Sequence, residues 1–271
     1  MISQTQDDFG SDAQRALLRR GRALYELTRD DPRMSYYGRT VGLAASDENS
    51  LDMLCALIDL QGSGSIVRLS DAELAVLRDA VERRGLASTH YTRWLGQQGA
   101  RDTARKVLGD IPLPDDLSLH RIGPDTPHEI LAQLAHVALA CGVLPPAGAV
   151  LRGQSRPGLG IVALDSAGRG VACAGAAAIL HPDRPEGRRQ CWWGMLATLP
   201  ERRGARLSLL LGAMALLDMQ ARYGFTEAFT GIEPGNTASE AVCTRLGLVP
   251  EGTHVLNVVD PAQLPGGRMT K

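Results

Sequence analysis

The sequence predicts a mixed α/β protein with a helix-rich first part and a sheet-containing second part. Three observations support this fold class. The chain has 271 residues, of which 44% are hydrophobic, and this is enough to bury a sizeable core. In the second part, apolar runs of strand length alternate with longer segments whose apolar residues repeat at helical spacing. The runs 158–165 and 170–179 flank a short turn at 166–169, which predicts a β-hairpin.

The first part contains two predicted helices and one predicted strand. Residues 12–28 place apolar side chains at near-helical spacing. Ser70 and Glu73 have the spacing of a capping box, and the helix that follows is expected to end at Gly85. The run 65–69, SIVRL, precedes that helix and predicts a strand, so this part is expected to be mixed as well.

A short linker is expected to divide the chain. The stretch 110–116, DIPLPDD, carries two prolines and three acidic residues between two patterned regions. We therefore predict a helix-rich N-terminal domain over residues 1–112 and a second domain over residues 113–271. The first domain is either of a different type or a degenerate copy of the second.

The second domain begins with a predicted strand at 117–122. Thr126 is expected to cap a helix that has Pro127 at its first position and Glu129 in the capping box. The remaining elements in chain order are the hairpin, a strand at 191–198, a helix from 207 to 224, a strand at 225–232, a helix at 237–246 and a last strand at 255–259.

Charge and composition exclude several classes of protein. The formal net charge is -1, so the chain has no positive excess with which to bind a phosphate backbone, and we expect no nucleic-acid partner. No run of about 18 apolar residues and no signal peptide is present, which predicts a soluble cytoplasmic protein without a membrane partner. The cysteines lack metal-type spacing, so we expect reduced thiols and no metal site.

Residues 198–208, TLPERRGARLS, lie after a predicted strand and open a predicted helix. Together with the order of the elements, this segment resembles the strand–loop–helix motif of the GNAT superfamily of acyltransferases, in which an Arg or Gln opens a Gly-rich turn. Arg203 and Gly204 match the Arg-Gly pair of that motif, whereas Arg206 and Ser208 stand at two later glycine positions. The resemblance implies a mostly antiparallel sheet flanked by helices in the second domain, preceded by the smaller helix-rich domain.

Residues 236–248, NTASEAVCTRLGL, resemble the closing helix motif of the same superfamily. Asn236 matches the residue that starts this helix. Cys243 stands where many relatives have a tyrosine that protonates the departing thiolate. A thiol has an ordinary pKa of about 8.5, so Cys243 is a candidate for this catalytic proton donor. The alternative is a buried cysteine that only packs in the helix.

The resemblance implies that coenzyme A binds at the N-terminus of the helix that begins near residue 207. Consecutive backbone N–H groups and the helix dipole would hold its pyrophosphate there. The Arg206 side chain either obstructs this seat or turns outward and grips a phosphate. The implied cofactor-binding residues are Leu196, Ala197, Thr198, Arg203, Gly204, Ala205, Arg206, Leu207, Ser208 and Asn236.

The implied reaction is direct attack of a neutral amine on acetyl-CoA, or another acyl-CoA, in a ternary complex. Backbone groups near Leu196 and Thr198 would pair with the pantetheine arm and stabilise the oxyanion. Because the strand at 191–198 has no acidic residue, Glu233 is the candidate general base and Glu227 the second choice. Both are alternatively solvated surface carboxylates.

Trp192 and Trp193 alternate on the strand at 191–198, so their side chains point to opposite faces. Either one packs in the core and the other lines the acceptor groove, or both pack in the core. The N-terminal domain is expected to cover or shape that groove.

Three functions stay open at this stage. The first is a small-molecule N-acetyltransferase. The second is a catalytically silent acyl-CoA-binding or regulatory module, which the altered glycine positions and the missing tyrosine would suit. The third is a structural protein that keeps the fold without the cofactor. The expected partner is a small-molecule amine acceptor, whose identity the fold does not define, and a homodimer is allowed.

Overall fold

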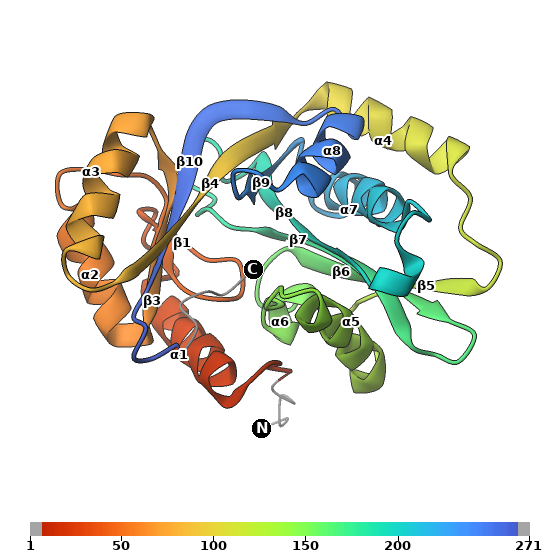
Figure 1. Ribbon diagram of the computed structural model, residues 1–271, viewed down its shortest axis with the longest axis horizontal. Coiled ribbons are helices and arrows are strands. Elements are labelled where there is room, and N and C mark those ends of the chain that lie inside the picture. The colour runs from red at the N-terminus through yellow and green to blue at the C-terminus, as the bar shows by residue number, and fades with distance from the viewer. Residues whose placement is uncertain (1–6, 265–271) are drawn as a thin grey trace.

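The protein is described here by a computed structural model, which covers residues 7–264. Its centre is a ten-stranded sheet with the order β1-β2-β3-β10-β4-β9-β8-β7-β6-β5, and helices flank it (Figure 1). The strands are β1 (Met34–Ser35), β2 (Gly42–Leu43), β3 (Ser63–Leu69), β4 (Ala87–Gly96), β5 (Leu117–Arg121), β6 (Gly158–Asp165), β7 (Gly170–Ala178), β8 (Gln190–Thr198), β9 (Glu227–Ile232) and β10 (Val249–Val259). The helices are α1 (Asp12–Thr28), α2 (Ser50–Gln61), α3 (Asp71–Glu82), α4 (Gln98–Asp110), α5 (His128–Ala140), α6 (Gly148–Leu151), α7 (Leu207–Tyr223) and α8 (Thr237–Arg245).

The predicted fold class is confirmed. Neighbouring strands run antiparallel except for the pairs β2–β3 and β8–β9, which are parallel. Helices α5 and α7 pack on opposite faces of the β5–β8 sheet, and both β6 and β7 are buried along their full lengths. This explains why β7 has the small-residue sequence GVACAGAAA, since neither face leaves room for bulk.

Helix α7 lies close to the sheet because a glycine faces a tryptophan. The Trp193 indole Nε1 donates a hydrogen bond of 2.9 Å to the carbonyl oxygen of Gly212. A Cβ atom at Gly212 would lie 2.8 Å from the Trp193 ring, so only glycine permits this approach. The contact joins α7 to β8, the two elements that carry the first sequence motif.

Strand β4 belongs to the first part of the chain but lies inside the second part's sheet. It pairs with β9 on one side and with β10 on the other, both antiparallel (Figure 1). A separate N-terminal domain is therefore not shown, because both parts build one continuous sheet. The predicted boundary near residue 112 falls in the connection between α4 and β5, and the division at that point stays a prediction.

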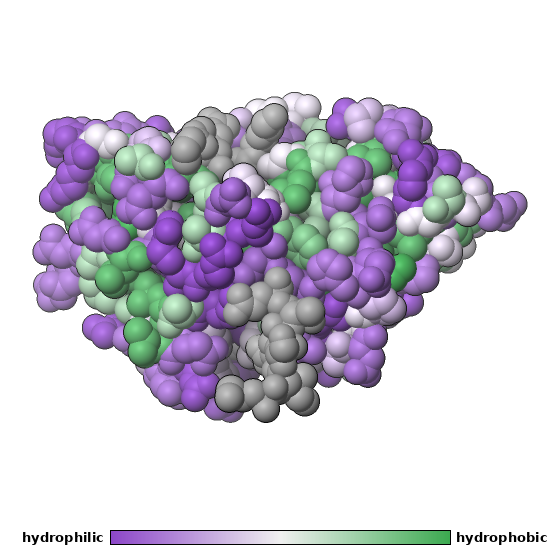
Figure 2. Space-filling view, turned by 90° about the horizontal axis from the view of Figure 1, so that it is seen from below, coloured by the Kyte–Doolittle hydropathy of each residue, from purple (hydrophilic) through white to green (hydrophobic). Residues whose placement is uncertain are grey.

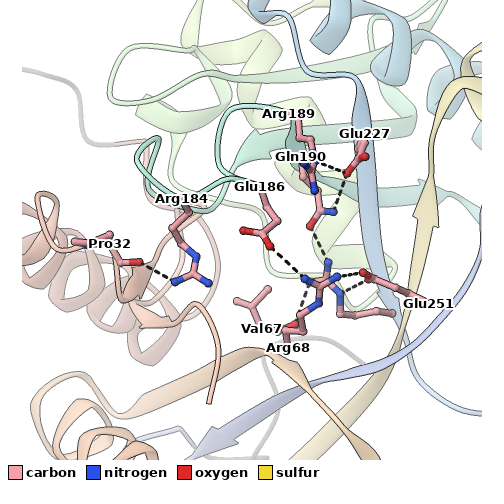
Figure 3. Close-up of polar contacts among 10 residues, drawn as sticks. Pro32, Val67, Arg68, Arg184, Glu186, Arg189, Gln190, Glu227 and Glu251 are labelled. Atoms are coloured by element: carbon pink, nitrogen blue, oxygen red, sulfur yellow. Dashed lines mark hydrogen bonds and ion pairs between the residues drawn. The ribbon is translucent and has the colours of Figure 1, made fainter. Parts of the chain in front are cut away.

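A buried charge network joins the two parts where β3, β4 and β10 meet (Figure 3). Arg93 on β4 is 1% exposed, and its Nε donates to Glu251 at 2.8 Å. Its other nitrogens donate to the Val67 carbonyl oxygen at 3.0 Å and to the Gln190 side chain at 2.8 Å. Arg68 also pairs with Glu251. Burial alone would raise the pKa of Glu251, but Arg93 and Arg68 outweigh it and hold this pKa below its usual value.

Most predicted elements are present, but several boundaries were wrong: among them, α3 ends at Glu82 rather than at Gly85, and β9 begins at Glu227 rather than at residue 225. The helix at 12–28 and the Ser70 capping box are confirmed. Helix α5 begins at His128 with Pro127 as its N-cap, because the Thr126 hydroxyl accepts the N–H of Gly123 at 2.8 Å instead of capping the helix. The last strand begins at Val249 rather than at residue 255.

Candidate functional site

Strands β8 and β9 diverge after a short paired stretch. They pair from Gln190–Glu227 to Trp192–Phe229, and the paired register ends there. Beyond this point β8 contains a β-bulge. Gly194 pairs with Gly175 of β7 and Ala197 pairs with Cys173, so β8 has one residue more than β7 between these two pairs. Met195 lies in this bulge with a φ of 53°, a conformation that non-glycine residues rarely adopt. The bulge interrupts the regular pairing of β8 with β7 at the point where β8 and β9 separate.

A cavity of about 560 Å³ fills the gap between β8 and β9. It is lined on one side by residues of the two sequence motifs, among them Thr198, Arg203, Ser208 and Asn236. On the other side its lining includes Tyr37 and other residues from the first part of the chain. Both parts of the protein therefore contribute to one site.

The first motif forms a loop and helix start that can hold an anion. Within the described residues, the backbone N–H groups of 204–208 have no hydrogen-bond acceptor in the protein. Gly204 has a φ of 85°, and a Cβ atom there would meet nothing within 4 Å. The Ser208 hydroxyl lies 2.9 Å from that of Thr198, which joins the first turn of α7 to the end of β8. Free N–H groups at the positive end of a helix form an anion-binding seat.

Arg206 adopts the conformation that a glycine position requires. Its φ is 58°, and it is the N-cap of α7. In the described part of the chain, Arg206 and Met195 are the non-glycine residues with positive φ, and both lie at this site. Such conformations cost free energy and are found preferentially at functional sites. Arg206 thus keeps the loop geometry despite replacing glycine.

The predicted cofactor-binding residues lie together. Those that line the cavity are Leu196, Ala197, Thr198, Arg203, Ser208 and Asn236. Gly204, Ala205, Arg206 and Leu207 lie between Arg203 and Ser208 and form the bordering loop and helix start. The Asn236 side chain caps α8 by accepting the N–H of Ser239 at 3.2 Å. Their role in binding stays a prediction.

The two predicted catalytic residues, Cys243 and Glu233, both line the cavity, but their surroundings differ. Cys243 is buried, and burial raises the pKa of its thiol to about 12. A thiol with this pKa releases its proton poorly, so the surroundings disfavour Cys243 as a proton donor. Glu233 follows β9 at the cavity wall, where a base could reach an incoming amine.

Glu227, the second choice for the base, lies away from the cavity lining. Its carboxylate accepts hydrogen bonds from Arg189 and Gln190 at 3.3 Å each (Figure 3). It also accepts one from Gln97 at 3.0 Å. These contacts give Glu227 a structural role at the start of β9, and they favour Glu233 of the two candidates.

Both tryptophans are among the residues that line the cavity, and Trp193 also packs in the core, so the structure matches neither sequence-based alternative in full. Trp193 is buried against α7, whereas the Trp192 ring lies 4.7 Å from the ring of Tyr37. Arg39 is 5% exposed and lies beside both rings. Sequence reasoning missed Tyr37, Arg39 and Tyr91, because they come from the first part and belong to no motif.

The structure gives two further findings on ligands and environment. Within residues 7–264, no group of three or more His, Cys, Asp and Glu side chains is placed to hold a metal ion. No helix in this range has both the length and the apolar character to cross a membrane.

Comparison with known proteins shows similarity in fold alone. No family model matches the sequence, and no curated protein matches it. Among solved structures, a GCN5-related N-acetyltransferase-like protein from Streptococcus suis aligns with a TM-score of 0.53 and 17% identity over 90% of this chain and 100% of its own. A GCN5-related N-acetyltransferase from Kribbella flavida aligns with a TM-score of 0.52 and 15% identity over 90% of this chain and 95% of its own.

A tandem GNAT protein from the clavulanic acid biosynthesis pathway gives a TM-score of 0.51 at 17% identity, over 78% of this chain and 67% of its own. These alignments span both parts of the chain. The protein therefore has a GNAT fold.

Proposed function

We propose that the protein transfers an acyl group from acyl-CoA, in the first place acetyl-CoA, to the amine of a small molecule. The observation that carries the proposal is the split between β8 and β9, with a cavity in the gap and unpaired N–H groups of 204–208 beside it. A thioester on a long phosphorylated arm suits this arrangement, because the phosphates would bind the helix start and the arm would lie along the unpaired β8 edge.

The proposed reaction is a direct attack in a ternary complex. The amine nitrogen adds to the thioester carbonyl carbon and forms the N–C bond. Backbone N–H groups of the β8 bulge around Leu196 stabilise the oxyanion. Glu233, directly or through water, accepts the proton that the amine loses. The C–S bond then breaks, and the thiolate takes up a proton to give free coenzyme A and the amide.

A second candidate is an acyl-CoA-binding module without turnover. Two observations favour it: Cys243 replaces the proton donor that many relatives have and has a raised pKa, and Arg206 stands at a glycine position of the phosphate loop. Both candidates require acyl-CoA binding, and only the transferase releases free thiol in the presence of an amine.

Calorimetric titration with acetyl-CoA, free coenzyme A and longer acyl thioesters is the first test. We expect saturable binding to the wild type and none to Gly204→Glu, because a carboxylate would lie against the pyrophosphate. Gly168→Glu is the matched control, since Gly168 also has a positive φ and open space around its Cβ position but lies in the β6–β7 turn. Equal binding by wild type and Gly204→Glu would show that this loop is not the seat. Thiol release with an amine panel then separates the two candidates.

A further inference from the structure

The side of the cavity that faces the first part of the chain carries two neutral polar side chains next to each other. Ser65 on β3 and Asn257 on β10 both line the cavity, and they lie directly opposite each other in the register of the two strands. Opposite residues of an antiparallel pair point to the same face of the sheet, with their Cβ atoms about 4.5–5.5 Å apart. One small molecule can therefore contact both side chains.

Neither of these side chains has a hydrogen-bond partner among the described residues. Ser65 is 7% exposed, so its hydroxyl is largely shielded from bulk water. Gly42 leaves the room for this hydroxyl, because a Cβ atom at position 42 would collide with the Ser65 Oγ. Buried polar groups nearly always have a hydrogen-bond partner. Since a hydroxyl and a carboxamide can each donate and accept, the Ser65–Asn257 pair suits a ligand with neutral hydroxyl groups.

The charged residues of the lining have other interactions or belong to another part of the site. Arg39, Tyr91 and Glu233 already interact within the molecule. Arg203 lies in the phosphate loop on the opposite side of the cavity. The described lining thus assigns no cation to an acidic group on the acceptor, and an acceptor without carboxylate or phosphate fits it better.

Another buried hydroxyl, that of Thr230, belongs to the gap between β8 and β9. Thr230 is 8% exposed, and its Oγ1 lies 3.3 Å from the place of a Cβ atom at Gly194. Side chains alternate along β9, so Thr230 points to the face opposite to that of Phe229. Ser65 and Asn257 are therefore the polar contacts that this arrangement offers to the body of an acceptor.

An aromatic and aliphatic patch lies beside the Ser65–Asn257 pair. Val67 is two residues from Ser65 on β3, so both side chains point to the same face. Val67 packs in one cluster with Phe229, against which Tyr37 and Trp192 also pack, and all four line the cavity. The rings of Tyr37 and Trp192 lie 4.7 Å apart. The outer surface shown in Figure 2 differs, because hydrophilic side chains predominate there.

An aminosugar or aminocyclitol has a surface that matches this lining. The C–H groups of its ring form an apolar face that packs on aromatic rings, and the hydroxyl groups on its rim donate and accept hydrogen bonds. Ligand pockets commonly combine an apolar lining with a few polar groups that fix the orientation of the ligand. We propose that the acceptor is a hydroxylated ring amine of this class, whose neighbouring hydroxyl groups bind Ser65 and Asn257 while its ring packs on Trp192. This proposal rests on the acyl-transfer function proposed above.

The first experiment compares three amines with six-membered rings on the wild-type protein, with acetyl-CoA and a thiol-release assay. Glucosamine carries several hydroxyl groups, 2-aminocyclohexanol carries one, and cyclohexylamine carries none. Because only the neutral amine attacks, each kcat/KM is divided by the fraction of neutral amine at the assay pH. We expect glucosamine to exceed cyclohexylamine by about 100-fold or more, with 2-aminocyclohexanol between them, since cyclohexylamine leaves the buried polar groups unpaired. Equal or better use of cyclohexylamine would overturn the proposal.

The second experiment removes the two polar groups. Ser65→Ala deletes the hydroxyl, and Asn257→Leu replaces the carboxamide by an apolar side chain of similar size. Each change is expected to lower kcat/KM for glucosamine by about 10-fold or more without lowering the value for cyclohexylamine. Thr89→Val is the matched control, because Thr89 lies opposite Asn257 on β4 but is not among the residues that line the cavity.

The control should leave both kcat/KM values unchanged. Equal losses for glucosamine and cyclohexylamine in Ser65→Ala and Asn257→Leu would contradict the binding of hydroxyl groups and indicate a structural role. Ser65→Ala removes no hydrogen bond to another described residue, so we expect its thermal transition to match that of the wild type. If Asn257→Leu does not fold, Ser65→Ala and the wild-type comparison decide.

Failure of acyl transfer can be told apart from failure of this proposal. If no amine releases thiol, the proposed reaction is wrong, and calorimetry with glucosamine in the presence of free coenzyme A still tests the binding site. Glucosamine binding that is weakened about 10-fold in Ser65→Ala would support the acceptor class. Absence of binding of both glucosamine and 2-aminocyclohexanol would refute it. Thiol release that prefers cyclohexylamine would uphold acyl transfer and refute the acceptor class alone.

Discussion

Replacing Arg93 with methionine should destabilise the protein, because the Glu251 carboxylate then loses one of its arginine partners. Arg93→Met keeps an apolar stem beside Phe229 but removes three hydrogen bonds, to Glu251, Gln190 and the Val67 carbonyl oxygen. Breaking a buried ion pair by removing one partner costs about 3–5 kcal/mol. Because Arg68 still pairs with Glu251, we expect the lower end, about 3 kcal/mol. Total stabilities are about 5–15 kcal/mol, so the loss is readily measured by urea unfolding.

The pH dependence of this loss tests its cause. In the wild type the pKa of Glu251 is depressed, so its contribution is fully present above the unfolded pKa of about 4.3 and is lost as pH falls through the folded pKa. Without Arg93, burial should instead raise this pKa, so protonation of Glu251 relieves the penalty as pH falls. The difference in unfolding free energy between wild type and Arg93→Met should therefore shrink from pH 7 to pH 4.

If the unfolding free energies of wild type and Arg93→Met differ by the same amount at every pH, the electrostatic explanation is refuted and the loss comes from packing alone. The surface pair Arg83–Asp79 offers a control, because both side chains are largely exposed and Arg83→Met should barely change stability. If Arg93→Met does not fold, the double variant Arg93→Met/Glu251→Leu should recover a folded protein, since it leaves no unpaired buried charge.

Three further predictions concern the site and its support. Glu233→Gln should lower kcat by about 100-fold or more, whereas Glu227→Gln should leave it nearly unchanged. Equal losses in the two variants would contradict the assignment of Glu233 as the base. Cys243→Ala should change kcat by less than about 10-fold, because a thiol with a pKa of about 12 is a poor acid, and a larger loss with intact acetyl-CoA binding would restore Cys243 as the donor. Gly212→Ala should lower the unfolding free energy by about 1–2 kcal/mol despite better helix propensity, because its Cβ would lie 2.8 Å from Trp193, and an unchanged urea midpoint would contradict that clash.

The sequence was most informative where structure depends on neighbouring residues. The loop at 198–208 and the helix start at Asn236 are recognisable because glycine, capping side chains and helical apolar spacing act within a few positions. Their placement beside one cavity follows from the fold that the order of elements predicts. The capping box of α3 is a purely local case and was predicted to the residue.

Pairing between strands that are distant in the sequence is not visible in the residue pattern in this way. Strand β4, ASTHYTRWLG, is half-buried along most of its length, so its sequence is too polar to mark it as an inner strand. Helix α4 begins without a side-chain cap and was not predicted either. The bulge at Met195 and the contact of Arg93 with Glu251 depend on strand register across distant segments, which residue patterns do not encode.

The arrangement of the first part resembles that of the second in one respect. In both, a strand is followed by a helix and a second strand of the same direction, as β3–α3–β4 and β8–α7–β9. In the first part, however, β10 fills the place between the two strands. The helix start also differs, because the Glu73 carboxylate bonds to Ser70 at the N-terminus of α3 and would repel a phosphate there. A degenerate copy thus stays a hypothesis, and we expect one coenzyme A site.

Removing residues 1–112 should abolish the fold rather than only alter acceptor choice. The deletion takes away β4, which pairs with Ile232 on β9 and with residues 249–259 on β10. Both neighbouring strands would then expose unpaired edges, and the wall around Tyr37 and Arg39 would be lost with them. We expect the truncated chain to be insoluble or to lack a cooperative thermal transition. Co-expression of 1–112 with 113–271 is the matched test, because the two fragments together still contain every strand. A stable truncated protein that binds acetyl-CoA would show that the second part folds alone and that β4 is an addition to its sheet.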